Sequence, residues 1–323
     1  MNRFLEAQDI SVRNPNDGRE ILSVSFSQSV GERLAIIGET GSGKSTLLRS
    51  LAGLQVVDKG RILFENDEVK GPDRRLVPVH PDIKYLSQRF ELPKFITVEN
   101  YLLRKEKIRV EDPELVFQAC DIEYLLARDT RELSGGERQR VAFAKELLSG
   151  PKLMLLDEPF SNLDAIHKQA LKQAIDHAQH SLGTSFMLVA HEPADIISWA
   201  EKVIILKNGR IHQSGKTKEV YSQPNSTYAA ELLGTFSLIK APTDFEQSKN
   251  LRFHRIDDLL FLRPHHVLIN SQGVFTGSIQ KVKYFGSFVE LLVESKLGIL
   301  TCVCTKIDFE PKTQIRFDIK PLN

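Results

Sequence analysis

The sequence GETGSGKST, residues 38–46, follows the apolar run LAII at 34–37 and opens the helical sequence TLLRSLAGL. The fixed positions of the pattern G-x-x-x-x-G-K-[ST] are occupied by Gly38, Gly43, Lys44 and Ser45. Glycines let consecutive backbone N–H groups curl around phosphate oxygens, and a helix start adds partial positive charge. A glycine turn with a surface lysine would also fit this sequence, but a strand before it and a helix after it are the context of a phosphate-binding loop.

The residue types in this phosphate loop have chemical reasons. Lys44 lies in the first turn of a helix, where the helix dipole disfavours a cation, and a bound β- or γ-phosphate would supply the missing anion. The hydroxyl of Ser45 can ligate Mg²⁺. We therefore predict a phosphate site that is built by Gly38, Glu39, Thr40, Gly41, Ser42, Gly43, Lys44, Ser45 and Thr46.

A second predicted strand ends in two carboxylates. The apolar run at 153–156 is followed directly by Asp157 and Glu158. In an open α/β sheet, ligands collect at the carboxyl ends of strands, so we expect these acids beside the phosphate loop. Asp157 is then the candidate Mg²⁺ ligand, and Glu158 is the candidate base that takes a proton from an attacking water. A helix cap or a solvated charge pair would explain the two acids equally well if they stood alone.

The sequence LSGGERQR, residues 133–140, precedes another helical run. Ser134 and Glu137 have the spacing of a capping box, which is typical of a well-formed helix start. The spacing leaves Gly135 and Gly136 unexplained, because each glycine costs about 1 kcal/mol relative to alanine inside a helix. A helix start without obstructing side chains would form a second phosphate-binding surface.

Together these segments resemble the ABC-type ATPases. Residues 133–140 are similar to the signature motif of that family and lie, as in the family, between the two phosphate-site motifs. The resemblance also identifies Gln88 as the Q-loop glutamine, Ser161 to Asp164 as the D-loop, and His191 as the switch histidine. It implies an α/β P-loop NTPase cassette with a mostly parallel core sheet, an antiparallel β subdomain and a helical subdomain.

The family resemblance also implies how the site works. In ABC ATPases two cassettes pair head to tail, and each ATP lies between the phosphate loop of one and the signature of the other. Ser134, Gly135 and Gly136 would contact the γ-phosphate of ATP that is bound to a second cassette, a copy or a paralogue. His191 would orient that phosphate and the attacking water, and Asp164 would communicate across the dimer.

ATP and Mg²⁺ are the substrate and the cofactor that the resemblance implies. The implied catalytic residues are Glu158, His191 and Lys44, and the implied metal ligands are Ser45, Gln88 and Asp157. The family usually has an aromatic ring near residues 12–16 to stack on adenine, and this sequence offers only the guanidinium of Arg13 there.

Length and composition set limits on the function. The 323 residues allow about two domains. A hydrophobic content of 41%, a charged content of 26% and a net charge of +1 argue against disorder and against a nucleic acid partner bound by bulk charge. Three cysteines cannot form the disulfide framework of a secreted scaffold. No apolar run approaches the roughly 18 residues that span a bilayer.

We predict a cassette over residues 1–240, with its helical subdomain at about 89–133, and an all-β domain over 241–323. The segment FLRPHHVLI at 261–269 resembles the start of the C-terminal TOBE domain, a small OB-like barrel, of importer ATPases of the spermidine, iron, sulfate or maltose type. Within it, His265 and His266 are expected in a strand, facing opposite ways. Cys302 and Cys304 would point to one strand face, as packing residues or as metal ligands.

The sequence therefore favours an ATPase that couples ATP hydrolysis to solute import through a separate permease. Its expected partners are a second cassette, transmembrane permease subunits and an extracytoplasmic solute-binding protein, and its expected location is the cytoplasmic side of the membrane, as a peripheral subunit. Two alternatives stay open, an exporter ATPase and a soluble ABC ATPase acting on nucleic acid or ribosomes. Fewer than about a hundred residues between phosphate loop and signature leave no room for a long coiled-coil insertion.

Overall fold

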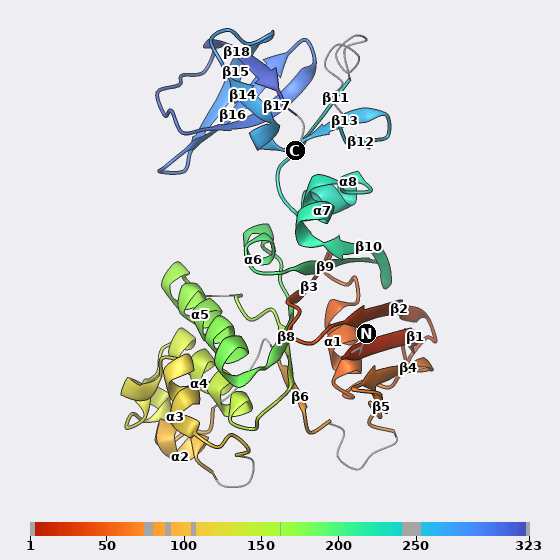
Figure 1. The fold of residues 1–323 in the computed structure, drawn as a ribbon, viewed down its shortest axis with the longest axis vertical. Coiled ribbons are helices and arrows are strands. Elements are labelled where there is room, and N and C mark those ends of the chain that lie inside the picture. Colours follow the sequence, from red (N-terminus) through yellow and green to blue (C-terminus); the bar gives the residue numbers. More distant parts are fainter. Residues whose placement is uncertain are drawn as a thin grey trace. The chain divides into compact units, whose positions relative to one another are not determined.

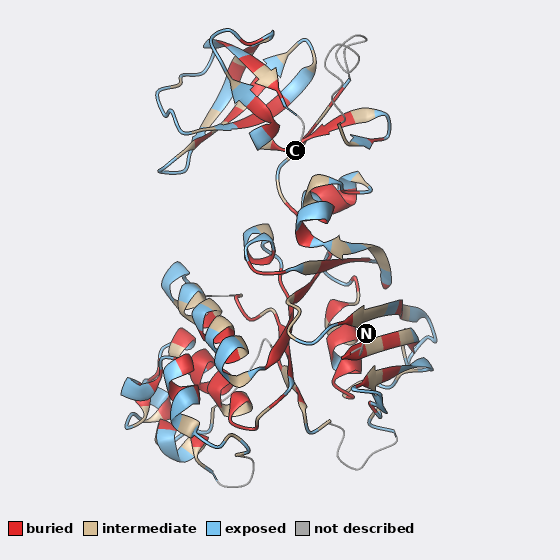
Figure 2. Ribbon diagram, in the orientation of Figure 1, coloured by how far each residue is buried: buried red, intermediate tan, exposed pale blue. Residues whose placement is uncertain are grey.

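The computed structural model describes residues 4–73, 80–87, 92–104, 108–161, 163–240 and 253–320. The chain divides into two compact units, Met1–Gly215 and Lys216–Asn323 (Figure 1). Each unit has a buried core of its own, which Figure 2 shows in red. This division falls earlier in the chain than the boundary at residue 240 that the sequence predicts.

A single mixed sheet runs through the first unit. Among the described residues its ten strands follow the order β5-β4-β1-β2-β10-β9-β3-β8-β7-β6. The strands are β1 (Leu5–Arg13), β2 (Glu20–Gln28), β3 (Leu34–Ile37), β4 (Lys59–Phe64), β5 (Asp67–Glu68), β6 (Ile83–Leu86), β7 (Leu153–Asp157), β8 (Ser185–Val189), β9 (Lys202–Lys207) and β10 (Arg210–Lys216).

The parallel part of this sheet carries the predicted apolar runs. The consecutive strands β9, β3, β8, β7 and β6 pair in parallel with one another, and every residue of β3, β7 and β8 is buried. β1, β2, β4 and β5 form the antiparallel part, in which β1 and β2 are an N-terminal hairpin. The expected α/β fold with a mostly parallel core and an antiparallel addition is confirmed.

The helices of the first unit follow from the sequence signals at their starts. They are α1 (Lys44–Leu51), α2 (Val98–Leu102), α3 (Pro113–Ala119), α4 (Gly135–Leu147), α5 (Ala165–Leu182) and α6 (Pro193–Ile197). Thr97, Asp112, Ser134 and Asp164 are side-chain N-caps of α2 to α5 in turn. α2 and α3 lie in the predicted helical region, and both pack against α4 (Figure 1). The described residues contain no helix that is long and apolar enough to cross a membrane.

The second unit begins with two short helices, α7 (Thr217–Ser222) and α8 (Thr227–Leu232). Buried Arg263 explains why they belong to it, since its guanidinium donates hydrogen bonds to the backbone carbonyls of Tyr221, Ala230, Gly234 and Thr235. These bonds satisfy carbonyls at the ends of both helices. These two helices therefore pack with the part of the second unit that contains Arg263. This explains why the division between the units falls before residue 240.

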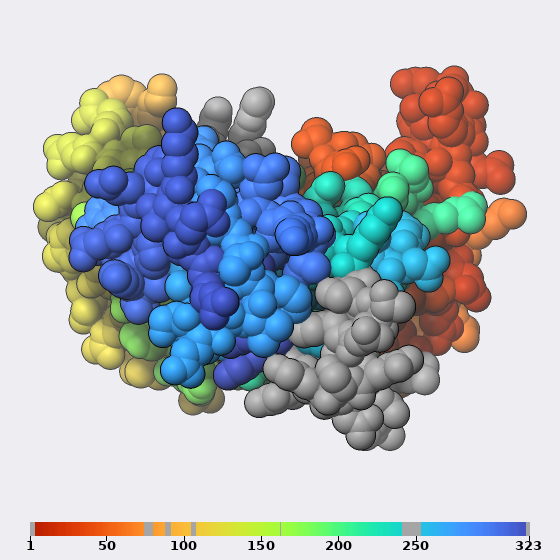
Figure 3. All heavy atoms as spheres, turned by 90° about the horizontal axis from the view of Figure 1, so that it is seen from above, coloured from red at the N-terminus to blue at the C-terminus, as the bar shows by residue number. Residues whose placement is uncertain are grey.

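Two antiparallel sheets complete the second unit among the described residues. The smaller has the order β11-β13-β12 and the larger the order β14-β18-β15-β16-β17. The strands are β11 (Ser237–Ile239), β12 (Arg255–Ile256), β13 (Leu259–Leu262), β14 (Val267–Ile269), β15 (Phe275–Tyr284), β16 (Val289–Ser295), β17 (Gly298–Cys304) and β18 (Gln314–Ile319). Because the edge strands β14 and β17 contact each other, the larger sheet curls into a near-barrel, as expected of an OB-like domain. Figure 3 shows its side chains as a continuous surface (blue).

The second unit contains the histidine pair and the two cysteines that the sequence singles out. The expectation that His265 and His266 lie in a strand is wrong, because Pro264 opens a 3₁₀ turn over Pro264–His266 in which the His266 N–H bonds to the Arg263 carbonyl at 2.9 Å. Cys302 and Cys304 both pack against the core of the near-barrel. The described residues contain no group of three or more His, Cys, Asp or Glu that could hold a metal ion.

Candidate functional site

The phosphate loop joins β3 to α1. Gly41 and Gly43 have φ angles of +80° and +100°, a left-handed backbone that favours glycine. Lys44 is 5% exposed, and its ammonium donates to the carbonyl oxygens of Gly38 at 2.7 Å and Glu39 at 2.8 Å. Burial lowers the pKa of Lys44, and the carboxylate of Glu158 is the largest opposing influence. The loop thus folds around a desolvated cation, which is suited to a phosphate oxygen.

Asp157 lies at the carboxyl end of β7, beside the start of α1. Its Oδ1 accepts a hydrogen bond from the Ser45 hydroxyl at 3.1 Å, and its Oδ2 accepts one from the Tyr85 hydroxyl at 2.8 Å. Burial raises the pKa of Tyr85 to about 12, so the phenol stays a neutral donor. Arg49 also hydrogen-bonds to Tyr85. The sequence predicts Asp157 and Ser45 together but misses Tyr85. Its signal is a phenolic hydroxyl in a strand whose first and last residues are buried, where a hydroxyl needs a hydrogen-bond partner.

Glu158 and His191 form a direct pair. They follow the neighbouring parallel strands β7 and β8, whose carboxyl ends meet at one edge of the sheet. The Nε2 atom of His191 lies 2.6 Å from Oε1 of Glu158. Glu158 has φ +53°, a conformation that costs about 1–3 kcal/mol for a residue other than glycine. Hydrogen bonds from its N–H to the Val189 carbonyl and from the Ser161 hydroxyl to its own carbonyl hold it there.

One cavity of about 260 Å³ brings the loop and this pair together. Its lining consists of Ile21, Thr40, Gly41, Gly43, Lys44, Ser45, Thr46, Glu158 and His191. Ile21 supplies an apolar wall, and Arg13, whose guanidinium could stack on adenine, is not among these lining residues. A second hollow of about 230 Å³ also borders Glu158 and His191. The candidate base and its histidine partner are therefore open to solvent from two cavities.

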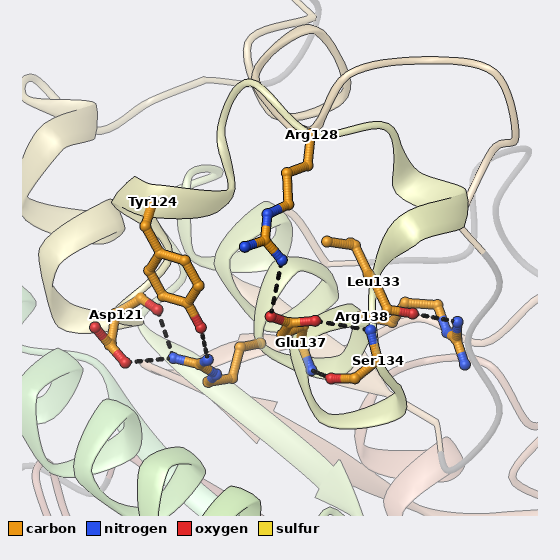
Figure 4. A network of polar contacts seen from close by, with 8 residues as sticks. Asp121, Tyr124, Arg128, Leu133, Ser134, Glu137 and Arg138 are labelled. Carbon is orange, nitrogen blue, oxygen red and sulfur yellow. Dashed lines mark hydrogen bonds and ion pairs between the residues drawn. The ribbon is translucent and has the colours of Figure 1, made fainter.

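The signature segment, residues 133–140, starts helix α4 with a closed set of hydrogen bonds (Figure 4). Ser134 Oγ accepts from the Glu137 N–H at 3.2 Å, and the Glu137 carboxylate accepts from the Ser134 N–H at 2.7 Å, so the predicted capping box is present. Arg128 pairs with Glu137 at 3.5 Å, and Arg138 donates to the Leu133 carbonyl at 2.6 Å. This network fixes the helix start without using any atom of the phosphate loop.

The remaining predicted residues lie apart from the cavity. Ser134, Gly135 and Gly136 are absent from its lining, so the structure does not join the signature segment to the phosphate loop within one chain. Asp164 is the N-cap of α5, and its carboxylate also accepts from Nδ1 of His167 at 2.8 Å. These bonds lower the pKa of Asp164. Gln88 lies outside the described residues.

The donor set at Asp157 fits a magnesium ion. Ser45 and Asp157 present a hydroxyl and a carboxylate oxygen 3.1 Å apart next to the phosphate loop. Mg²⁺ prefers oxygen ligands and is commonly held by one or two protein groups together with substrate phosphates and water. A cluster of many acidic ligands is therefore not required.

Comparison with known proteins gives a consistent result. The ABC transporter family model matches residues 21–161. The glucose import ATP-binding protein GlcV of Saccharolobus solfataricus is 37% identical over 63% of this chain and 60% of its own length. The sn-glycerol-3-phosphate import ATP-binding protein UgpC of Psychromonas ingrahamii is 30% identical over 94% of this chain and 83% of its own. The solved structure of cbiO1 from Clostridium perfringens, part of the transporter complex cbiONQ, has a TM-score of 0.60 and 26% identity, covering 68% of this chain and 91% of that one.

Proposed function

We propose that this chain, which belongs to the ABC transporter family, is the ATP-hydrolysing subunit of an import system. The observation that carries the proposal is the cavity in which the phosphate loop faces the Glu158–His191 pair. A loop for phosphate and a base for water are the two parts that hydrolysis of a phosphoanhydride needs. The alternative of an exporter subunit has less support, because the relatives that match nearly the whole chain are import proteins.

The phosphate loop, the Glu158–His191 pair and the candidate magnesium ligands have defined tasks in this proposal. Backbone N–H groups of the loop bind the phosphates, and the Lys44 ammonium exchanges its two carbonyl partners for β- and γ-phosphate oxygens. Glu158 accepts a proton from the attacking water, and His191, 2.6 Å away, holds that carboxylate and orients the γ-phosphate. Ser45 and Asp157 would hold Mg²⁺, which neutralises charge on the β- and γ-phosphates when bound.

The site is completed by a second cassette in this proposal. Gly135 has open space around the position of a Cβ, and the signature segment is not among the residues that line the chain's own cavity. A bare helix start of this kind can receive a phosphate from another chain. We take the second cassette to be a copy of this chain in a head-to-tail dimer, in which Asp164 lies near the other site.

The remaining partners follow from the family. Relatives named as import ATP-binding proteins serve different solutes, among them glucose and sn-glycerol-3-phosphate. This chain would act in the same way on permease subunits and sit as a peripheral subunit at the cytoplasmic side of the membrane. An extracytoplasmic solute-binding protein would deliver the solute.

Replacing Glu158 by glutamine tests the proposal. Glu158→Gln keeps the size and the hydrogen bond to His191 but removes the base, so ATP binding persists while turnover falls by about 10²- to 10⁴-fold. Phosphate release and binding of a fluorescent ATP analogue measure the two effects. Glu111→Gln, an exposed substitution, is the matched control and keeps the wild-type rate. Unchanged turnover in Glu158→Gln would remove Glu158 from the mechanism.

A further inference from the structure

The two glycines of the signature segment have different surroundings. A Cβ built on Gly135 would have no atom of the described residues within 4 Å, apart from its chain neighbours and the backbone of its own helix. A Cβ built on Gly136 would lie 2.7 Å from Cβ of His167, and still closer to the ring atoms Cγ and Cδ2. A change of ring rotamer could not remove this overlap, because the His167 Cβ itself is too close. Gly136 thus has a steric reason to be glycine within its own chain, whereas Gly135 has none.

His167 connects two segments that the proposed function places at the nucleotide. Its Nδ1 lies 2.8 Å from both carboxylate oxygens of Asp164, and its backbone N–H donates to Oδ1 of Asp164 at 2.9 Å. The same ring packs on the backbone of Gly136 at the start of α4. The side chain is therefore held on one side by the D-loop carboxylate and on the other by the signature helix.

A second contact between the same two segments lies one turn further along α4. The buried Gln139 donates from its amide to the carbonyl of Pro159, the residue after Glu158. Gly136 and Gln139 are three residues apart and so lie on one face of the helix. This face of α4 contacts the chain just after the candidate base through Gln139 and the start of α5 through Gly136.

We propose that Gly136 is required by the packing of His167, and that His167 is a positioning residue that ties the signature helix to the D-loop residue Asp164. The inference rests on the proposed function, in which Ser134 and Gly135 face the nucleotide of a second copy. A shift of the signature helix toward that nucleotide carries His167, and with it the Asp164 carboxylate. A signature segment and the D-loop of one chain then move together.

Enlarging residue 136 while shrinking residue 167 tests this link. Gly136→Ala lowers kcat by about tenfold or more with little change in KM for ATP, since ATP binds the phosphate loop and not this contact. Adding His167→Gly restores kcat to within about threefold of His167→Gly alone. Adding His167→Ala to Gly136→Ala restores less of kcat, because the alanine Cβ at residue 167 stays 2.7 Å from the methyl group at residue 136.

Gly135→Ala, alone and with His167→Gly, is the matched control. A methyl group at residue 135 does not overlap with His167, so the addition of His167→Gly brings no recovery of kcat. The Tm of the same variants gives a readout that does not depend on activity. We expect Gly136→Ala to lower Tm, and the addition of His167→Gly to recover part of that loss. A Gly136→Ala/His167→Gly variant that is as slow and as unstable as Gly136→Ala would overturn the packing of residue 136 on His167. Absence of ATPase activity in the wild-type chain would instead refute the proposed function, and the Tm series would still decide the packing.

The hydrogen bond to Asp164 has its own test. His167→Leu keeps apolar bulk but cannot donate, whereas His167→Asn is smaller and can. We expect His167→Leu to lower kcat by about fivefold at unchanged KM, and His167→Asn to stay within about twofold of wild type. Equal rates for the two variants would contradict a positioning role for His167.

Discussion

Removal of the Tyr85 hydroxyl perturbs the candidate magnesium site without touching a metal ligand. In Tyr85→Phe, Oδ2 of Asp157 loses a donor at 2.8 Å, while Oδ1 keeps the Ser45 hydroxyl at 3.1 Å. A hydrogen bond to a charged group contributes about 1.5–3 kcal/mol, and half-burial of Tyr85 places this one at the lower end. A loss of about 1.5 kcal/mol corresponds to roughly a tenfold change in an equilibrium constant.

The expected result is a change in the response to magnesium. The Mg²⁺ concentration that gives half-maximal ATP hydrolysis rises about tenfold in Tyr85→Phe, because an unheld carboxylate binds the ion less well, and the rate at saturating Mg²⁺ changes less. The assay is phosphate release at fixed ATP over a Mg²⁺ titration. Tyr101→Phe, which removes another half-buried hydroxyl, is the control and leaves the titration unchanged. A wild-type Mg²⁺ response in Tyr85→Phe would refute the assignment of Tyr85 as the support of Asp157.

Two further predictions concern the loop and the tail. Gly38→Ala places a Cβ 2.6 Å from the Ser42 hydroxyl and closer still to the Leu206 carbonyl, so the loop shifts and nucleotide affinity falls by about tenfold or more, as a fluorescent nucleotide titration measures. Arg263→Leu leaves carbonyls of α7 and α8 without their donor and destabilises the second unit by about 3 kcal/mol, which calorimetry detects as a lowered Tm. Wild-type nucleotide affinity or wild-type Tm would contradict the respective prediction.

The parts of the fold that local sequence patterns encode could be predicted. The apolar runs at 34–37 and 153–156 are fully buried strands of the parallel sheet, because a strand covered on both faces needs apolar residues throughout. The capping box of Ser134 and Glu137 is equally local, since it joins residues three apart. The closeness of Ser45 and Asp157 follows from the rule that carboxyl ends of parallel strands meet at one edge.

The parts that depend on packing between distant residues could not be predicted. Tyr85 reaches Asp157 because β6 pairs with β7 in one particular register, a fact that neither strand encodes alone. The close contact between Gly136 and His167, which leaves no room for a Cβ at residue 136, arises from the packing of α4 on α5. Arg263 draws the helices before residue 240 into the second unit through bonds to backbone carbonyls, which carry no sequence signal.

In the proposed function, the phosphate loop of one chain and the signature segment of a second chain form one site. Lys44→Ala disables the first and Ser134→Arg the second, so each variant alone hydrolyses no ATP. Two differently tagged variants are co-expressed, purified through both tags in turn, and assayed for phosphate release. Mixed dimers keep one intact site of two, so we expect about half of the wild-type rate for the doubly purified complex. A mixed complex as inactive as its parents would contradict a site shared between chains.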